Sequence, residues 1–191
     1  TIYNRNTFGI EHPTVGLLNI GTEETKGNDL VKESYQLLKE KAEELDINFV
    51  GNVEGRDAFS GKLDILIADG YTGNVFLKTV EGIGKLVKRT LSESIKKNIF
   101  TTIGAIPALP AINSLKKAMD YKEYGGALFL GVKKPVVKAH GSSDEKLFEF
   151  TIKQAEQFVK NKAVDKMIEE FQKINEIQKN ESENETQKVE K

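Results

Sequence analysis

Residues 15–29 read VGLLNIGTEETKGND, and this stretch decides the fold class. Its first six residues are apolar apart from Asn19 and predict a buried strand, residues 15–20. A loop of small and polar residues follows, and a helix is predicted over residues 29–45 because its apolar positions fall near a 3.6-residue spacing. A strand, a small-residue loop and a helix in this order are typical of parallel α/β sheets.

The same alternation continues along the chain. Strands are predicted over residues 48–53, 63–68, 127–130 and 136–139, and helices over residues 74–98 and 144–160. A short helix is expected to end at Met119. The helix over residues 74–98 is longer than a crossover helix needs, so we expect a helical hairpin, residues 74–120, to protrude from a mostly parallel sheet.

The C-terminal part differs from the rest. Residues 163–177 place their apolar side chains on one helical face, which predicts an amphipathic helix over residues 163–179 that docks on the protein or on a partner chain. Residues 180–191 are polar and low in complexity, and we expect them to be disordered.

The composition excludes several classes of function. With 28 Lys and Arg residues against 29 Asp and Glu residues, the net charge is −1, which argues against nucleic-acid binding through bulk charge. The absence of cysteine excludes disulfides, thiolate metal sites and a cysteine nucleophile. Two histidines are too few for a histidine-based metal cluster, and we expect no metal. No run of about 18 apolar residues and no signal-peptide pattern is present, so we expect an intracellular protein and a fragment of a longer chain.

Three loops have the same design, in which a strand ends, small residues follow and a helix begins. They are GTEETKGND (21–29), DGYTGN (69–74) and HGSSD (140–144). Glycine lets the backbone approach a ligand, and the N–H groups at a helix N-terminus favour an anion. Because the carboxyl ends of parallel strands line one crevice, the loops are predicted to meet around one phosphate-like ligand. The alternative is that Asn28, Asn74 and Ser142 or Ser143 only cap helices.

Basic side chains lie in or beside these loops: Lys26, Arg56, Lys78 and Lys138. Lys78 lies one helical turn after Asn74 on the same face, and Lys138 shares a strand face with His140. His140 could orient an anion or transfer a proton. The alternatives are solvated surface lysines and a histidine with a structural hydrogen bond.

The segment IFTTIGAIPALPAI, residues 99–112, carries no charge, whereas residues 85–117 around it hold seven Lys or Arg and one Glu. An apolar tip within a basic collar suits shallow insertion at an anionic membrane surface, and it equally suits a dimer interface. The tip residues are Ile99, Phe100, Ile103, Ile106, Leu109 and Ile112.

Several catalytic motifs are absent from the sequence. There is no Walker-type phosphate loop, no Gly-x-Gly-x-x-Gly fingerprint and no Gly-x-Ser-x-Gly elbow. Ser142 and Ser143 are therefore poor candidates for a triad nucleophile.

Four segments in order, VGLLNIGTEETKGND, NFVGNVEGRDAFSGKLDILIADGYTGNVFLKTVEG, DYKEYGGALFLGV and VVKAHGSSD, resemble the bacterial phosphate acyltransferases of phospholipid synthesis, the PlsX family. The resemblance runs from Pro13 to Phe158. It implies an enzyme that transfers a long-chain acyl group from acyl carrier protein to inorganic phosphate. It also implies an isocitrate/isopropylmalate dehydrogenase-like three-layer α/β fold, a homodimer, no cofactor, and a cytoplasmic location peripheral to the membrane. The acyl phosphate would pass to a glycerol-3-phosphate acyltransferase.

From this resemblance we expect a PlsX-like phosphate acyltransferase region over residues 1–162, without the family's N-terminal Asp-Ala-Met-Gly-Gly-Asp segment before Thr1. Part of the site's wall is therefore expected to lie outside this chain. The loops and the resembling segments together give candidate catalytic residues Lys78, His140 and Asn74. The candidate substrate- and phosphate-binding residues are Lys26, Gly27, Asn28, Asn52, Glu54, Arg56, Asp69, Gly70, Thr72, Gly73, Lys138, Gly141, Ser142 and Ser143.

Three readings compete with this one. One is a related phosphate acetyltransferase-like enzyme, and another is a decarboxylating dehydrogenase, against which the absence of a recognisable magnesium-binding carboxylate set counts. The third is a non-catalytic membrane-associated or dimerisation module. The basic residues Lys85, Lys88 and Arg89 could dock an acidic carrier protein or a lipid surface.

Overall fold

The structure is a computed structural model that describes residues 1–118, 126–139, 141 and 143–175. The chain divides into two compact units. The sheet unit covers Thr1–Ile67 and Gly125–Lys191, and the hairpin unit covers Ala68–Tyr124.

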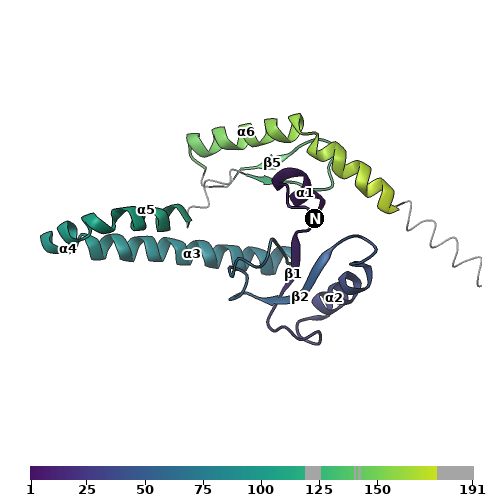
Figure 1. Cartoon of the computed structure of the whole chain (residues 1–191), viewed down its shortest axis with the longest axis horizontal. Coiled ribbons are helices and arrows are strands. Elements are labelled where there is room, and N and C mark those ends of the chain that lie inside the picture. Colours follow the sequence, from purple (N-terminus) through teal and green to yellow (C-terminus); the bar gives the residue numbers. More distant parts are fainter. Residues whose placement is uncertain (119–125, 140, 142, 176–191) are drawn as a thin grey trace, which may run out of the picture. The chain divides into compact units, whose positions relative to one another are not determined.

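A three-stranded parallel sheet forms the centre of the sheet unit, in the order β2-β1-β3 (Figure 1). The strands are β1 (Thr14–Asn19), β2 (Asn48–Glu54) and β3 (Ile65–Ile67). The central strand β1 buries Val15, Leu17 and Leu18, as expected of a strand with neighbours on both edges and cover on both faces. The predicted parallel α/β architecture is confirmed at this level.

Helix α2 (Asp29–Lys41) packs against β1 and β2. Its buried Tyr35 contacts the ring of Phe49, with the ring centroids 5.4 Å apart. The hydroxyl of Tyr35 donates a hydrogen bond of 3.1 Å to Glu24 in the loop before the helix. This helix ends four residues earlier than the sequence predicts, and Ile47 N–H then bonds back to the Ala42 carbonyl.

A second, antiparallel sheet of β4 (Ala127–Leu128) and β5 (Val137–Lys138) lies in the same unit, against helix α6 (Glu145–Lys160). The two strands are shorter than predicted. Helix α6 buries Leu147, Thr151 and Phe158, which follow a helical spacing of four and seven residues. The chain is helical again over residues 163–175, where Val164 and Met167 are buried. Residues 176–179 of the predicted amphipathic helix, and the predicted tail over residues 180–191, lie outside the described residues.

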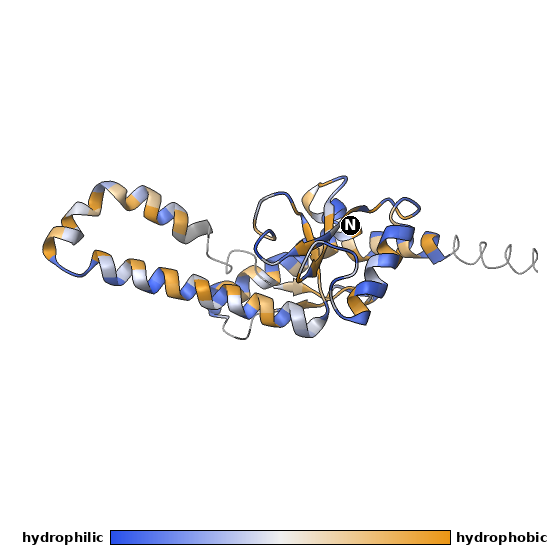
Figure 2. Cartoon of the chain, turned by 90° about the horizontal axis from the view of Figure 1, so that it is seen from below, coloured by the Kyte–Doolittle hydropathy of each residue, from blue (hydrophilic) through white to orange (hydrophobic). Residues whose placement is uncertain are grey.

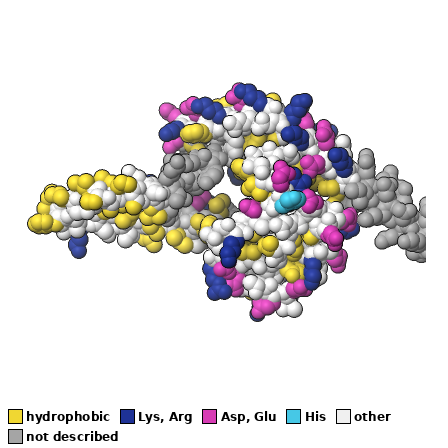
Figure 3. Space-filling model, in the orientation of Figure 1, with side chains coloured by type: hydrophobic (Ala, Val, Ile, Leu, Met, Phe, Trp, Pro, Cys, Tyr) yellow, Lys and Arg dark blue, Asp and Glu magenta, His cyan; other side chains and the backbone are white. Residues whose placement is uncertain are grey.

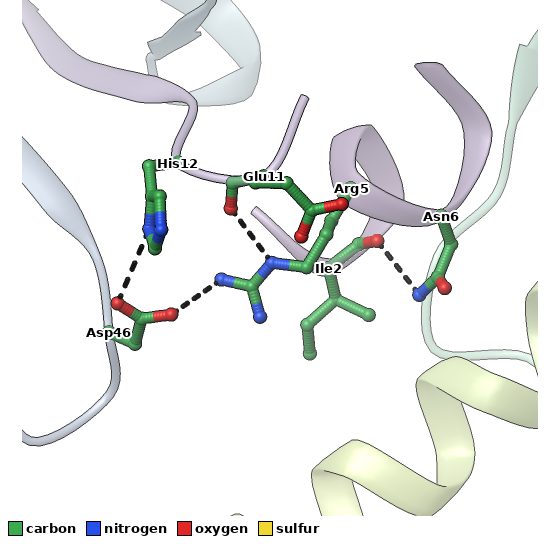
Figure 4. A network of polar contacts seen from close by, with 6 residues as sticks. All are labelled: Ile2, Arg5, Asn6, Glu11, His12 and Asp46. Atoms are coloured by element: carbon green, nitrogen blue, oxygen red, sulfur yellow. Dashed lines mark hydrogen bonds and ion pairs between the residues drawn. The ribbon is translucent and has the colours of Figure 1, made fainter. Parts of the chain in front are cut away.

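A short helix, α1 (Ile2–Phe8), joins this unit through polar contacts at its surface (Figure 4). Arg5 donates one hydrogen bond of 3.0 Å to the Glu11 carbonyl and another of 2.8 Å to the Asp46 carboxylate. His12 Nδ1 lies 3.7 Å from the other oxygen of Asp46. These contacts fasten the start of the chain to the turn between α2 and β2.

The hairpin unit consists of α3 (Gly70–Ile95), α4 (Ile99–Gly104), the 3-10 helix η1 (Ile106–Ala108) and α5 (Leu109–Ala118). Helix α3 begins four residues before the predicted start, at Gly70. The predicted uncharged turn is itself helical, because Asn98 and Thr101 form a capping box that starts α4. The predicted helical hairpin is present with these changed boundaries.

Candidate functional site

The carboxyl ends of β1 and β2 lie side by side, since the last residues Asn19 and Glu54 are register partners in a parallel pair. The segments that follow the two strands therefore leave from the same edge of the sheet. One of them carries Lys26, Gly27 and Asn28, and the other carries Arg56. Within the sheet unit, the structure brings these predicted residues to one edge.

A tight turn over residues 23–26 is held at both ends by asparagine side chains. The carbonyl oxygen of Glu23 accepts hydrogen bonds from Lys26 N–H (3.1 Å) and from Asn52 Nδ2 (2.9 Å). The carbonyl oxygen of Lys26 accepts a bond of 3.0 Å from Asn19 Nδ2. Asn19 was not among the predicted site residues. A polar side chain at the end of an otherwise apolar strand was the signal that could have indicated it.

Asn28 caps helix α2, as predicted. Its side-chain oxygen accepts a hydrogen bond of 3.0 Å from Val31 N–H. Gly27 has φ +91°, a conformation that glycine adopts without strain, and it turns the chain into the helix. The first N–H groups of α2 thus start at this sheet edge, three residues after Lys26, and a helix N-terminus favours an anion. The acidic side chain of Asp29 lies in the same first turn and offsets part of this effect.

Arg56 is paired with carboxylates. Its Nε lies 2.6 Å from Glu54 and 3.6 Å from Asp57. These two acidic groups offset its charge, so Arg56 contributes less positive potential to the sheet edge than its residue type suggests. Glu54 lies in the predicted site as the partner of Arg56.

The predicted cap at Asn74 is wrong, because Asp69 caps α3. Asp69 Oδ1 accepts hydrogen bonds of 2.9 Å from both Tyr71 N–H and Thr72 N–H. The hydrogen bonds from Thr72, and then that from Tyr71, hold the pKa of Asp69 below its ordinary value. Asn74 therefore lies in the second turn, where its backbone N–H belongs to the helix, and Lys78 lies a turn further on.

The Asp69 cap also changes the chemistry expected of the second loop. An ionised carboxylate stands at the start of α3 and occupies the N–H groups of Tyr71 and Thr72. Gly73 N–H bonds to the Asp69 carbonyl. Gly70, Thr72 and Gly73 thus lie at an acid-capped helix start, where Asp69 leaves fewer free N–H groups for an anion.

The predicted cap at Ser142 or Ser143 is also wrong. Helix α6 is capped by Asp144, whose Oδ1 accepts a hydrogen bond of 2.9 Å from Leu147 N–H. Lys138 is exposed on β5, where it pairs with Ala127, and Gly141 is exposed. Ser143 is partly exposed, whereas His140 and Ser142 lie outside the described residues.

The three loops are divided between the two units. Residues 69–74 belong to the hairpin unit, and the other two loops belong to the sheet unit. The meeting of all three around one ligand stays a prediction. Over the part of the chain that the structure describes, no group of three or more histidine or acidic side chains is arranged to hold a metal ion.

Hydrophobic residues occur along the helices of the hairpin unit (Figure 2), and over residues 70–115 many of their side chains are exposed. Phe100 at the tip is 84% exposed, and no described residue of α3 or α4 is buried. In the space-filling view, hydrophobic side chains gather around the α4 end of the hairpin (Figure 3). Within the described residues, no helix is both long enough and apolar enough to cross a bilayer.

Another face of α3 is basic. A shallow open groove there is lined by Lys85, Lys88, Arg89, Ser92, Glu93 and Lys96. These positions recur every three or four residues, so they form one stripe along the helix. Glu93 lies 4.0 Å from Arg89 and offsets part of the charge.

A parallel sheet with a capped helix starting at the carboxyl ends of its strands defines an α/β protein, a class in which ligands commonly bind at that edge. Residues 1–166 match the family model described as "Fatty acid synthesis protein", and the chain belongs to this family.

Similar proteins agree with this assignment. The chain is 48% identical over 172 residues to a phosphate acyltransferase of Clostridium perfringens, a match that covers 90% of this chain and 50% of the relative. It is 44% identical over 173 residues to a phosphate acyltransferase of Thermoanaerobacter pseudethanolicus, covering 91% of this chain and 51% of the relative. The chain therefore spans about half the length of the curated relatives it matches.

Proposed function

We propose that this chain forms part of a phosphate acyltransferase, which transfers a long-chain acyl group from acyl carrier protein to inorganic phosphate. The product is an acyl phosphate for phospholipid synthesis. The observation that carries the proposal is the 48% identity to a phosphate acyltransferase over 90% of the chain. The N-terminus of α2, three residues after Lys26, supports a phosphate site at the carboxyl ends of β1 and β2.

The proposed reaction is a direct displacement at a thioester. An oxygen of phosphate forms a bond to the thioester carbonyl carbon, the carbon–sulfur bond breaks, and the carrier leaves as a thiolate. Phosphate is already anionic at neutral pH, so no strong base is needed. A thiol pKa of about 8.5 makes the leaving group a good one.

The residues of this chain then have two tasks. Lys26 and the first N–H groups of α2 bind phosphate and orient it, because fixing two reactants in line removes much of the entropic barrier. The oxyanion that develops on the carbonyl oxygen needs hydrogen-bond donors. Lys78, Asn74 and His140 are the proposed donors, and Lys138, Gly141 and Ser143 would complete the wall.

The proposed fold of the complete protein is the three-layer isocitrate/isopropylmalate dehydrogenase type. The three parallel strands of this chain would then be one part of a larger sheet. The residues that the relatives have beyond the matched half would supply the rest of the sheet and part of the site.

For the hairpin unit we propose contacts with a second copy of the chain and with an anionic membrane surface. Its exposed apolar side chains would be buried in such a contact. Negative charge is attracted by the basic residues of α3 and the residue after it, which are Lys85, Lys88, Arg89 and Lys96. The basic groove equally suits an acidic carrier protein. A location at the cytoplasmic membrane surface would bring the acyl phosphate to the glycerol-3-phosphate acyltransferase that uses it.

The test is a hydroxylamine-trapping assay on the 191-residue chain with palmitoyl-acyl carrier protein. We expect acyl hydroxamate to form above a control without phosphate, because hydroxylamine traps acyl phosphate. A folded sample that gives no phosphate-dependent product would favour a non-catalytic module. Product from acetyl thioesters alone would favour an acetyltransferase-like enzyme.

A further inference from the structure

Strand β2 contains a β-bulge opposite the middle of β1. Val15 pairs with Phe49 and Gly16 pairs with Gly51, so Val50 is an extra residue in β2. Gly51 has φ +90°, which glycine adopts readily. The extra residue shifts the alternation of side chains, and a bulge of this kind often redirects a side chain near a functional site. Here it puts Asn52 on the same side of the sheet as Phe49, the side that α2 covers.

Asn52 is a buried polar residue with one unsatisfied atom. Asn52 is only 6% exposed, and its Nδ2 donates a hydrogen bond of 2.9 Å to the Glu23 carbonyl. Its Oδ1 is buried without a hydrogen-bond partner among the described residues. Both atoms belong to one planar amide, so the unpaired oxygen lies beside the same loop. A leucine, which branches at the same carbon, would leave no unpaired acceptor, so packing alone does not explain an asparagine here.

Asn19 holds the other end of the same turn. Its Nδ2 donates to the Lys26 carbonyl over 3.0 Å, and its Oδ1 accepts from Ile20 N–H over 2.8 Å. A Cβ atom on Gly27 would lie 2.8 Å from Asn19 Oδ1, so the chain passes too close for any larger residue. The two asparagines therefore hold the backbone at Glu23 and at Lys26, the two ends of the turn.

We infer that Asn19 and Asn52 are positioning residues of the phosphate site: they hold the 23–26 turn so that Lys26 lies beside the first N–H groups of α2. The inference rests on the proposed function. Neither amide needs to touch the anion, because each acts on a backbone carbonyl of the turn. The bulge at Val50 and Gly51 serves this arrangement by directing Asn52 into the loop.

The main test is calorimetric titration of the 191-residue chain with inorganic phosphate, for wild type and Asn52→Leu. We expect the affinity for phosphate to fall at least tenfold while the melting temperature stays the same or rises. Asn52→Asp keeps the volume of the side chain but loses the hydrogen-bond donor when it is ionised. It should lower the affinity for phosphate in the same way. Asn19→Leu tests the second amide.

The matched control is Asn6→Leu. Asn6 Nδ2 also donates to a backbone carbonyl, that of Ile2 over 3.1 Å, but it does so within α1. This variant should bind phosphate within twofold of wild type. A local readout is hydrogen exchange of the Lys26 amide, which donates a hydrogen bond to the Glu23 carbonyl. This amide should lose protection in Asn52→Leu but not in Asn6→Leu.

The outcomes separate the inference from the proposed function. If wild type binds phosphate and the Asn52 and Asn19 variants bind it equally well, the positioning role is overturned and the phosphate site stands. If phosphate binding and stability fall together in every variant, the asparagines are only structural and the inference is again overturned. A folded wild type without affinity for phosphate overturns the inference, and the hydroxylamine-trapping assay then tests the proposed function separately.

Discussion

The carboxylate of Asp64 accepts two hydrogen bonds from Thr14, one from its backbone N–H and one from its hydroxyl, each 2.8 Å long. The backbone N–H of Asp64 donates in return to Thr14 Oγ1 over 2.9 Å. This reciprocal pair joins the start of β1 to the start of β3 and so helps to set their register. The hydrogen bonds from Thr14 hold the pKa of Asp64 below its ordinary value of 3.8.

The first prediction concerns stability in acid. A lowered pKa in the folded state means that the Asp64 carboxylate stabilises the fold above its ordinary pKa of 3.8, and that this contribution is lost as the pH falls through the folded value. Asp64→Asn should therefore lower the urea midpoint at pH 6 and flatten its decline in acid. Asp165→Asn, outside this strand pair, is the control. If the urea midpoints of wild type and Asp64→Asn fall in parallel as the pH is lowered, the stabilising role of the Asp64 carboxylate is contradicted.

The second prediction concerns the helix cap at the sheet edge. Asn28→Ala removes the acceptor for Val31 N–H and should cost about 1 kcal/mol of stability. It should also weaken phosphate binding several-fold, because the first turn of α2 frays. Asn98→Ala removes the equivalent cap from α4 and should leave phosphate affinity unchanged. Equal phosphate affinities in both variants would show that the Asn28 cap does not contribute to phosphate binding.

The fold was largely predictable because its decisive elements are local. The apolar run of β1 and the 3.6-residue spacings of α2 and α6 are visible without knowledge of tertiary contacts. Helix boundaries were predicted less well where a side-chain cap starts the helix before the first residue of the apolar pattern. Asp69 caps α3, which therefore begins at Gly70, four residues before Asn74, because a carboxylate can accept hydrogen bonds from two backbone N–H groups at once.

The candidate site was only partly predictable. Lys26, Gly27 and Asn28 are adjacent in sequence, so their placement at one sheet edge follows from the strand-loop-helix pattern. The burial of Asn52 depends on a bulge in β2, and a one-residue insertion in the strand pairing leaves no mark in the apolar pattern. The pairing of Arg56 with Glu54 was equally hidden, since opposite charges two residues apart are common on surfaces.

The third prediction tests Lys78 as a catalytic group. It is exposed on α3, so Lys78→Gln should leave the melting temperature unchanged. If its ammonium stabilises the oxyanion, turnover should fall about tenfold or more, since hydrogen bonds to charged groups are the stronger ones. Lys88→Gln, on the same helix in the basic groove, should change the KM for acyl carrier protein without this loss of turnover. Unchanged turnover in Lys78→Gln would remove this residue from the mechanism.

The fourth prediction tests what covers the apolar tip of the hairpin. Ile103 and Ile106 are 57% and 59% exposed, and burying such a side chain in a bilayer or a second subunit stabilises the contact by about 1.5–3 kcal/mol. The Ile103→Asp, Ile106→Asp double variant should therefore release the protein from anionic liposomes in a sedimentation assay. Ile152→Asp on α6 is a matched control, because Ile152 is 58% exposed but lies outside the hairpin. Liposome binding that persists in the double variant, together with a shift from dimer to monomer in analytical ultracentrifugation, would assign the tip to dimerisation instead of the membrane.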